Sequence, residues 1–301
     1  MTVPFGTKLR AAFDRYGQVC LGVDAHPATL SFHNLEDSAL GAERLFMDLL
    51  EAAITRVGVM KVQVALFERF GSAGFLALER VFERMRQSDI LLIADIKRGE
   101  IGTSMAGYIS AWLGSDSPLL ADAITVNPYL GVGALDDTFR YASAHGRGVF
   151  VLAANSNPES FAMQMSGTPS LAARVVAEVF DANMRLETEH SENRSTIASD
   201  QQEFGQVSDG SLSDIGLVIG ATVKLENYGI SGSDLGNSPI LAPGFGHQGA
   251  QIADLRRLFG SLSENVLVAE SRSLVHHPMA EIPSRIAENQ AAIQSALAEV
   301  V

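Results

Sequence analysis

Four charged residues stand in or directly after apolar runs, where an ionised side chain is costly. Asp24 and Asp95 each close such a run, and Lys61 lies inside another. Lys97 follows Asp95 by two residues, so both side chains share one side of an extended chain. A buried ammonium group is destabilising unless a carboxylate pairs with it. A structural ion-pair network is one interpretation, but the convergence of all four residues favours a reaction centre.

A second group of residues can bind an anion. The segment APGFGHQGA at 242–250 contains Gly244, Gly246 and Gln248, between an apolar run and a stretch with helical spacing. Glycines there allow backbone N–H groups to approach a phosphate at the start of a helix. Arg272, just beyond the next apolar run, can add a bidentate contact. An ordinary glycine turn beside a surface arginine is the alternative, but the position of Arg272 favours a phosphate site.

The elements that must position these residues repeat one pattern, a short apolar run followed by a segment with helical spacing. Nearly continuous apolar runs are typical of parallel strands buried on both faces. We expect strands at 18–24, 59–65, 90–95, 123–126, 149–154, 216–221, 239–243 and 266–270. We expect helices at 38–56, 75–88, 102–114, 132–145, 168–186, 222–232, 248–260 and 280–299. The alternation predicts an α/β fold, a (β/α)₈ TIM barrel whose strand ends share one mouth; a doubly wound open sheet is the alternative.

One interval departs from this rhythm. Residues 187–214, between the fifth and sixth predicted strands, contain seven acidic residues and one arginine, a net charge of −6. A polar, acidic segment buries little apolar surface. We therefore expect a mobile surface insertion within a single barrel domain spanning 1–301, with a substrate lid as the alternative interpretation.

Composition limits the classes of partner. The 301 residues are 47% hydrophobic and carry a net charge of −13, which argues against nucleic acid and against anionic membrane surfaces. We identify neither a signal peptide nor an apolar run that could span a bilayer. The single cysteine, Cys20, cannot form an internal disulfide and fits a reducing cytoplasm. The histidines form no cluster at metal-ligand spacing, so we expect no metal site.

The charged residues lie in strings that resemble the orotidine 5′-phosphate decarboxylase family, particularly its longer bacterial branch. The strings occur in family order and span the chain from about residue 5 to 275. They are LGVDAHP (21–27), KVQVALFERFG (61–71), ADIKRGEIGTSMAGY (94–108), NPYLG (127–131), NSNPES (155–160), VIGATV (218–223), APGFGHQGA (242–250) and ESRS (270–273). The resemblance implies decarboxylation of orotidine 5′-monophosphate to UMP without cofactor or metal, the last step of de novo pyrimidine synthesis.

The resemblance also implies roles around the reacting centre. Asp24 would bind the ribose hydroxyls, and Lys61 and Asp95 would belong to an alternating charge network. Lys97 would protonate C6 of the pyrimidine as CO₂ leaves, and Ser156 would contact the base. These roles fit the chemistry, because loss of CO₂ develops carbanion character that a nearby ammonium stabilises and then protonates.

The resemblance places further residues at the phosphate and between subunits. Arg272, together with Gln248, would hold the phosphate. The family is dimeric, with sites at the interface, so Glu100 and a hydroxyl near position 104 (Ser104 or Thr103) would reach into the partner's site.

Glu100 departs from the family motif, which has aspartate at this position. The extra methylene displaces the carboxylate, and a misplacement of about 1 Å can lower a rate by on the order of 10²-fold. We expect function to be retained. One alternative is a related metal-dependent aldolase resembling hexulose-phosphate synthases. The other is a catalytically impaired homologue that binds UMP without turnover.

Overall fold

The computed structural model describes residues 2–198 and 211–299 and contains a closed barrel of eight parallel strands. Each strand pairs with the next along the chain, and the pairing of Val19 in the first strand with Val268 in the last closes the circle. The strands are β1 (Val19–Val23), β2 (Val59–Gln63), β3 (Leu91–Arg98), β4 (Ala123–Val126), β5 (Gly148–Ala154), β6 (Ile215–Ile219), β7 (Ile240–Pro243) and β8 (Val266–Glu270). The predicted (β/α)₈ barrel is confirmed, and the open sheet is excluded.

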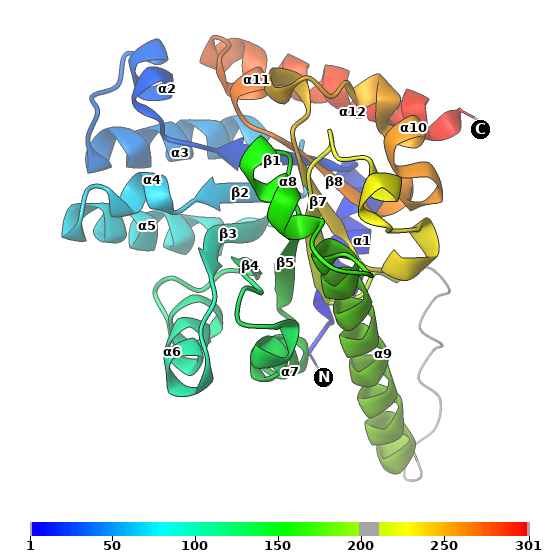
Figure 1. The fold of residues 1–301 in the computed structure, drawn as a ribbon. Helices are drawn as coiled ribbons and strands as arrows, with labels where there is room; N and C mark the ends of the chain where they lie inside the picture. The colour runs from blue at the N-terminus through cyan, green and yellow to red at the C-terminus, as the bar shows by residue number, and fades with distance from the viewer. Residues whose placement is uncertain (1, 199–210, 300–301) are drawn as a thin grey trace.

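Helices surround the strands as an outer layer (Figure 1). One core cluster lies between the strands and these helices, and a second fills the barrel interior, where Phe150 and Leu267 are fully buried. The longer helices are α1 (Phe5–Tyr16), α3 (Ala39–Ala53), α5 (Ser72–Met85), α6 (Gly102–Leu113), α7 (Asp136–Ala144), α9 (Leu171–Ala198) and α12 (Ile282–Ala298). The shorter ones are α2 (Pro27–Phe32), α4 (Ala65–Glu68), α8 (Pro158–Gln164), α10 (Leu255–Phe259) and α11 (Arg272–Val275).

Helix α1, which the sequence analysis did not predict, belongs to the interior cluster. Its side chains Phe5, Leu9 and Phe13 are buried there. Gly6 permits the contact, because a Cβ at this position would stand 1.7 Å from the carbonyl oxygen of Leu212. The chain amino-terminal to β1 is therefore part of the barrel's core.

The prediction of a surface loop over 187–214 is wrong for residues 187–198, which continue α9. This helix reaches well beyond the barrel in Figure 1. Ion pairs with α7 hold its exposed side: Arg185 lies 3.1 Å from Asp136, and Glu189 lies 2.5 Å from Arg140. A polar composition therefore did not mean a loop, because cross-helix ion pairs supply partners for the charged side chains.

The end of the same segment is also not a surface loop. Asp214 is buried, its carboxylate accepting hydrogen bonds from the Gly6 N–H at 2.9 Å and the Ser143 hydroxyl at 2.6 Å. This aspartate therefore links α1 and α7 to the start of β6. Residues 199–210 of the predicted insertion lie outside the described residues.

Two of the predicted helices are wrong. The interval 222–232 holds a short 3₁₀ turn, Leu225–Tyr228, that ends at Gly229 with a φ of 71°. The interval 248–260 holds another 3₁₀ turn, Ile252–Asp254, before the five-residue α10. Glycines with positive φ stand at Gly249 and Gly260, a backbone conformation that ends helices.

Candidate active site

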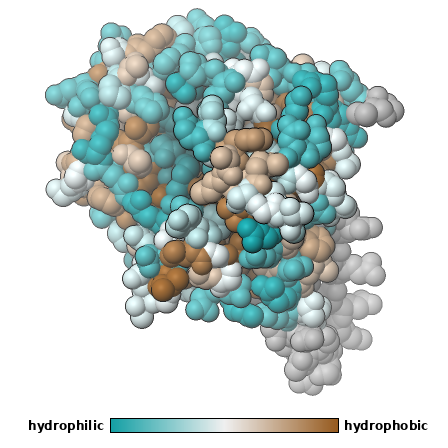
Figure 2. All heavy atoms as spheres, in the orientation of Figure 1, coloured by the Kyte–Doolittle hydropathy of each residue, from teal (hydrophilic) through white to brown (hydrophobic). Residues whose placement is uncertain are grey.

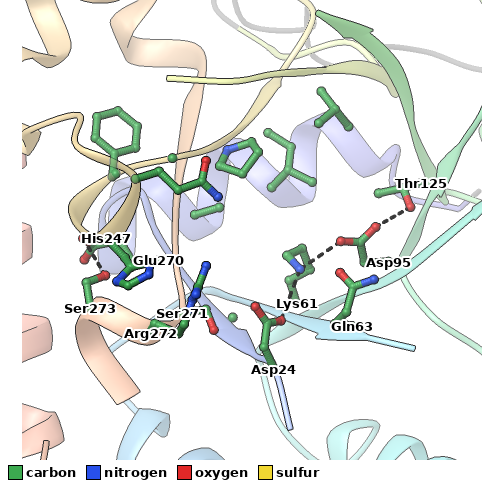
Figure 3. Close-up of a pocket in the computed structure, with 18 of the residues that line it drawn as sticks. Asp24, Lys61, Gln63, Asp95, Thr125, His247, Glu270, Ser271, Arg272 and Ser273 are labelled. Atoms are coloured by element: carbon green, nitrogen blue, oxygen red, sulfur yellow. Dashed lines mark hydrogen bonds and ion pairs between the residues drawn. The ribbon is translucent and has the colours of Figure 1, made fainter. Parts of the chain in front are cut away.

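The charged residues of the strand ends surround one cavity of about 280 Å³ at the carboxyl-terminal mouth of the barrel (Figure 3). Asp24 follows β1, Lys61 lies in β2, and Asp95 and Lys97 lie in β3. Arg272 begins α11, directly after β8, and lines the same cavity. The barrel therefore brings together residues that are up to 248 positions apart in the chain.

Four of these residues form a row of alternating charge. The ammonium of Lys61 lies 3.7 Å from an Asp24 carboxylate oxygen and donates a hydrogen bond of 2.9 Å to Asp95 Oδ2. The other oxygen of Asp95 accepts a 2.5 Å hydrogen bond from Lys97 Nζ. Lys61 and Asp95 are buried, whereas the side chain of Lys97 is 43% exposed, so its ammonium is accessible to a ligand.

The row keeps its buried members ionised. Burial by itself would raise the pKa of Asp95, but the ammonium groups of Lys61 and Lys97 outweigh it and hold this pKa well below its usual range. Burial would lower the pKa of Lys61, and the carboxylates of Asp95 and Asp24 raise it instead. Lys61 therefore carries its charge beside a fixed carboxylate.

Asp24 has an unused acceptor. Its Oδ1 atom is buried and has no hydrogen-bond partner among the described residues, although the Lys61 ammonium lies at 3.7 Å. A buried carboxylate oxygen without a donor is unfavourable. A ligand hydroxyl in the cavity can supply that donor.

The predicted anion end of the cavity is assembled from the loops after β7 and β8. Gly246 approaches α11 closely, since a Cβ there would lie 2.5 Å from the Cβ of Ser273. Arg272 is half-buried, and no described carboxylate lies within ion-pair distance of it. Gly244 and Gln248 also line the cavity. An unpaired guanidinium in a cavity is suited to bind an anion.

One part of the anion prediction is wrong. The glycines were expected to precede a helix that would offer its first N–H groups, but they lead into the 3₁₀ turn Gly246–Gln248. The structure therefore gives no helix dipole at this loop, and the guanidinium of Arg272 is the cationic group at this end of the cavity.

Four predicted residues lie outside the cavity lining, and Gly246 of the loop after β7 is one of them. Ser156 stands at its edge and donates a 3.2 Å hydrogen bond to Gln248, which joins the loops after β5 and β7. Glu100 accepts a hydrogen bond of 3.0 Å from the Ile101 N–H, and Ser104 is exposed on α6. The single chain does not bring the last two residues to Lys97.

Several polar residues that line the cavity were not predicted as site residues, and Thr125 and Glu270 are two of them. Thr125 lies within the apolar strand β4, and Glu270 closes β8. Both carry the signal that identified Lys61 and Asp24, a polar residue in or at the end of an apolar run. Glu270 is 3% exposed, and its carboxylate accepts hydrogen bonds from Ser273 and Asn289.

Glu270 gives a prediction for stability against pH. Burial raises the pKa of its carboxyl, so the folded state binds this proton more tightly than the unfolded state does. The stabilisation that the protonated Glu270 carboxyl contributes is therefore lost as the pH rises from the pKa of this group in the unfolded state to its raised pKa in the folded state. We expect Glu270→Gln to raise the melting temperature more at pH 8 than at pH 5.

Thermal unfolding across this pH range, with the exposed Glu226→Gln as control, measures the effect. Equal shifts at both pH values would show that Glu270 titrates alike in the folded and unfolded states.

Two negative findings apply to the described residues. No group of three or more histidine, cysteine, aspartate or glutamate side chains is arranged to hold a metal ion. No described helix has the length and hydropathy required to cross a membrane.

The fold and the cavity define a class: a parallel (β/α)₈ barrel with a row of charged residues and an arginine in the cavity at its mouth. Residues 17–260 match the model of the orotidine 5′-phosphate decarboxylase / HUMPS family. The chain belongs to this family.

Curated relatives point to one branch of it. Proteins named orotidine 5′-phosphate decarboxylase from Salinispora arenicola and Streptomyces coelicolor are 43% and 40% identical. The alignments cover 90% and 91% of this chain and 89% and 90% of the relatives. A solved structure from Streptomyces avermitilis superposes with a TM-score of 0.86, at 36% identity over 99% of this chain and 98% of that chain. These relatives give no support to the metal-dependent aldolase.

Proposed function

We propose that this protein catalyses the cofactor-free decarboxylation of orotidine 5′-monophosphate to UMP and CO₂, the last step of de novo pyrimidine synthesis. The observation that carries the proposal is the row Asp24–Lys61–Asp95–Lys97 in a cavity that also holds the unpaired Arg272. The row supplies a fixed carboxylate and an ammonium group, and Arg272 supplies a group that can bind an anion. None of these groups requires a bound cofactor. Membership of the family and the names of the relatives support the same reaction.

The chemical step follows from the positions of Lys97 and Asp95. Departure of CO₂ leaves an electron pair on C6, and the Lys97 ammonium stabilises this developing charge and then donates its proton to C6. Asp95 forms ion pairs of 2.9 Å with Lys61 and 2.5 Å with Lys97. Because these groups are already in place before the reaction, little reorganisation accompanies the formation of charge.

The remaining residues bind the parts of the substrate that do not react. Asp24 accepts hydrogen bonds from ribose hydroxyls, which supplies a donor for its buried Oδ1 atom. Arg272 binds the phosphate, with Gln248 and the loop at Gly244 and Gly246 beside it. Ser156 contacts the pyrimidine from the loop after β5. Binding energy from the phosphate can thereby be used to hold the reacting carbon against Lys97.

We further propose that the enzyme is a homodimer, located in the cytoplasm, whose sites lie at the subunit interface. Glu100 and Ser104 then complete the partner's site. The loops after β3 and β4 expose apolar side chains: Ile101, Tyr129 and Leu130 are 60%, 78% and 50% exposed. Figure 2 shows a group of hydrophobic residues between α6 and α7, as expected of a surface that another subunit covers.

The test is an assay of the purified protein by the loss of orotidine 5′-monophosphate absorbance. We expect turnover that is insensitive to a chelator. We expect Glu100→Asp, which restores the family's carboxylate position, to raise kcat by no more than about 10²-fold.

The outcomes separate the hypotheses. Absence of turnover in both the natural protein and the Glu100→Asp variant would refute the proposed function. Tight UMP binding without turnover would identify the impaired homologue, and activity lost to a chelator would identify a metal-dependent reaction.

A further inference from the structure

Thr125 is the polar residue of β4, and it contacts the charged row at Asp95 and Lys97. It is 1% exposed, and its hydroxyl is the next group beyond Asp95 in Figure 3. The hydroxyl donates a 2.8 Å hydrogen bond to Asp95 Oδ1, the oxygen that also accepts from Lys97 Nζ. The same hydroxyl oxygen accepts a 2.9 Å hydrogen bond from the backbone N–H of Lys97. One side chain thus contacts both residues of the Asp95–Lys97 pair.

The backbone at Lys97 needs such a contact. Its φ is 47°, in the left-handed region that is unfavourable for a residue with a side chain. The register of β3 and β4 explains where this conformation comes from. Ala94 pairs with Ile124 and Arg98 pairs with Val126, so three residues of β3 stand opposite Thr125 alone. Strand β3 bulges at this point, as strands often do beside active sites.

The bulge removes Lys97 from the regular ladder, and the hydroxyl of Thr125 supplies the acceptor for its N–H. The position of the Lys97 backbone and the orientation of the Asp95 carboxylate are therefore fixed by the same group. A valine at 125 would have the shape of threonine and would support neither hydrogen bond.

We propose that Thr125 is a positioning residue for the reaction, whose hydroxyl holds the left-handed backbone of Lys97 and the carboxylate of Asp95 in the geometry that places the Lys97 ammonium against the substrate. This inference rests on the proposed function. Thr125 acts through Lys97 and Asp95, so its loss affects the chemical step and leaves the phosphate and ribose contacts of Arg272 and Asp24 in place.

The kinetic test compares two substitutions. We expect Thr125→Val to lower kcat by roughly 10²-fold, because the proton donor is displaced, and to change KM by less than about threefold. Thr125→Ser keeps the hydroxyl and should retain kcat within about threefold of the natural protein. The split between kcat and KM distinguishes an effect on the chemical step from a loss of substrate binding.

The chain offers a matched control in Thr138. This threonine is also fully buried, and its hydroxyl has no hydrogen-bond partner among the described residues. Thr138→Val should leave kcat unchanged. If Thr125→Val retains full kcat, or Thr125→Ser loses as much as Thr125→Val, the inference is overturned. Should the valine variant not fold, Thr125→Ala removes the same hydroxyl and has the same expected outcome.

A second measurement tests the geometry without relying on catalysis. Amide hydrogen exchange at Lys97 in the ligand-free protein should be slow in the natural chain and in Thr125→Ser, and at least tenfold faster in Thr125→Val, as expected for a lost acceptor. Equal exchange rates in all three proteins would overturn the inference. A third result is that the amide exchange rates follow this expectation while the natural protein does not decarboxylate orotidine 5′-monophosphate. That result would refute the proposed function and would leave the positioning of the Lys97 backbone by Thr125 supported.

Discussion

Replacement of Lys97 by alanine is expected to lower kcat by about 10⁴-fold or more. General acid catalysis contributes typically about 10²–10⁴-fold, and electrostatic stabilisation of the developing charge adds a comparable factor. UMP affinity should change far less, because Arg272 and Asp24 remain. Single-turnover kinetics and UMP titration measure the two effects, with exposed Lys224→Ala as the control. A Lys97→Ala variant within tenfold of natural kcat would remove Lys97 from the chemical step.

A second substitution at this position, Lys97→Cys, allows the ammonium group to be restored chemically. Its single cysteine, Cys20, is fully buried, and burial raises the pKa of the thiol to about 12, which makes it unreactive. In Lys97→Cys the new thiol at position 97 is therefore the one that an alkylating reagent modifies. Treatment with bromoethylamine restores an ammonium at position 97, and we expect it to recover a substantial part of kcat. Recovery in treated Lys97→Ala would point to a different site of modification.

The second large effect is expected for Asp95→Asn, which keeps the shape of the side chain and removes its charge. Lys61 then remains buried with Asp24 as its ion-pair partner at 3.7 Å. Loss of one partner from a buried ion pair typically costs about 3–5 kcal/mol of stability. We expect the free energy of unfolding at pH 7 to fall by about 3 kcal/mol, and kcat to fall by on the order of 10³-fold because Lys97 loses its fixed partner.

The pH dependence of this loss has a definite sign. The folded pKa of Asp95 lies below its unfolded value of about 3.9, so its stabilisation is fully present above that pH. It is lost as the pH falls through the lowered folded pKa, where natural Asp95 is also protonated. The difference between natural protein and Asp95→Asn should therefore be constant from pH 7 to about pH 5 and shrink below about pH 3.9.

Urea unfolding at several pH values measures this difference, and exposed Asp116→Asn serves as the control for removal of a surface carboxylate. A difference between natural protein and Asp95→Asn that does not depend on pH would show that packing, and not charge, causes the loss.

Most of the strands could be predicted because their signal is local. A strand buried on both faces must be apolar throughout, and each such run in the sequence became a barrel strand, with bounds within three residues. The elements that failed depend on distant partners. The carboxyl-terminal half of α9 is polar but is paired with α7 by Arg140 and Arg185, and α1 became interior because Gly6 allows it to approach Leu212.

The sequence by itself determined which residues are candidates for the chemistry. A lysine in a buried strand requires a carboxylate, and an arginine beyond the last strand is available to an anion; these are requirements of charge and burial at single positions. The tertiary structure decided which groups meet. The pairing of β2 with β3 places Lys61 against Asp95. Closure of the barrel between β8 and β1 then brings Arg272 to the same cavity, where no carboxylate of the described chain pairs with it.

The hydrogen bond between the Lys97 backbone and Thr125 also depends on the tertiary structure. A pattern of residue types contains no register, and the bulge that turns Lys97 into the left-handed region exists because three residues of β3 face Thr125. Hydrogen bonds between strands that lie 28 residues apart depend on that register at the scale of a single residue. The sequence therefore identifies the residue that we propose as proton donor, and the pairing of β3 with β4 decides where that residue lies.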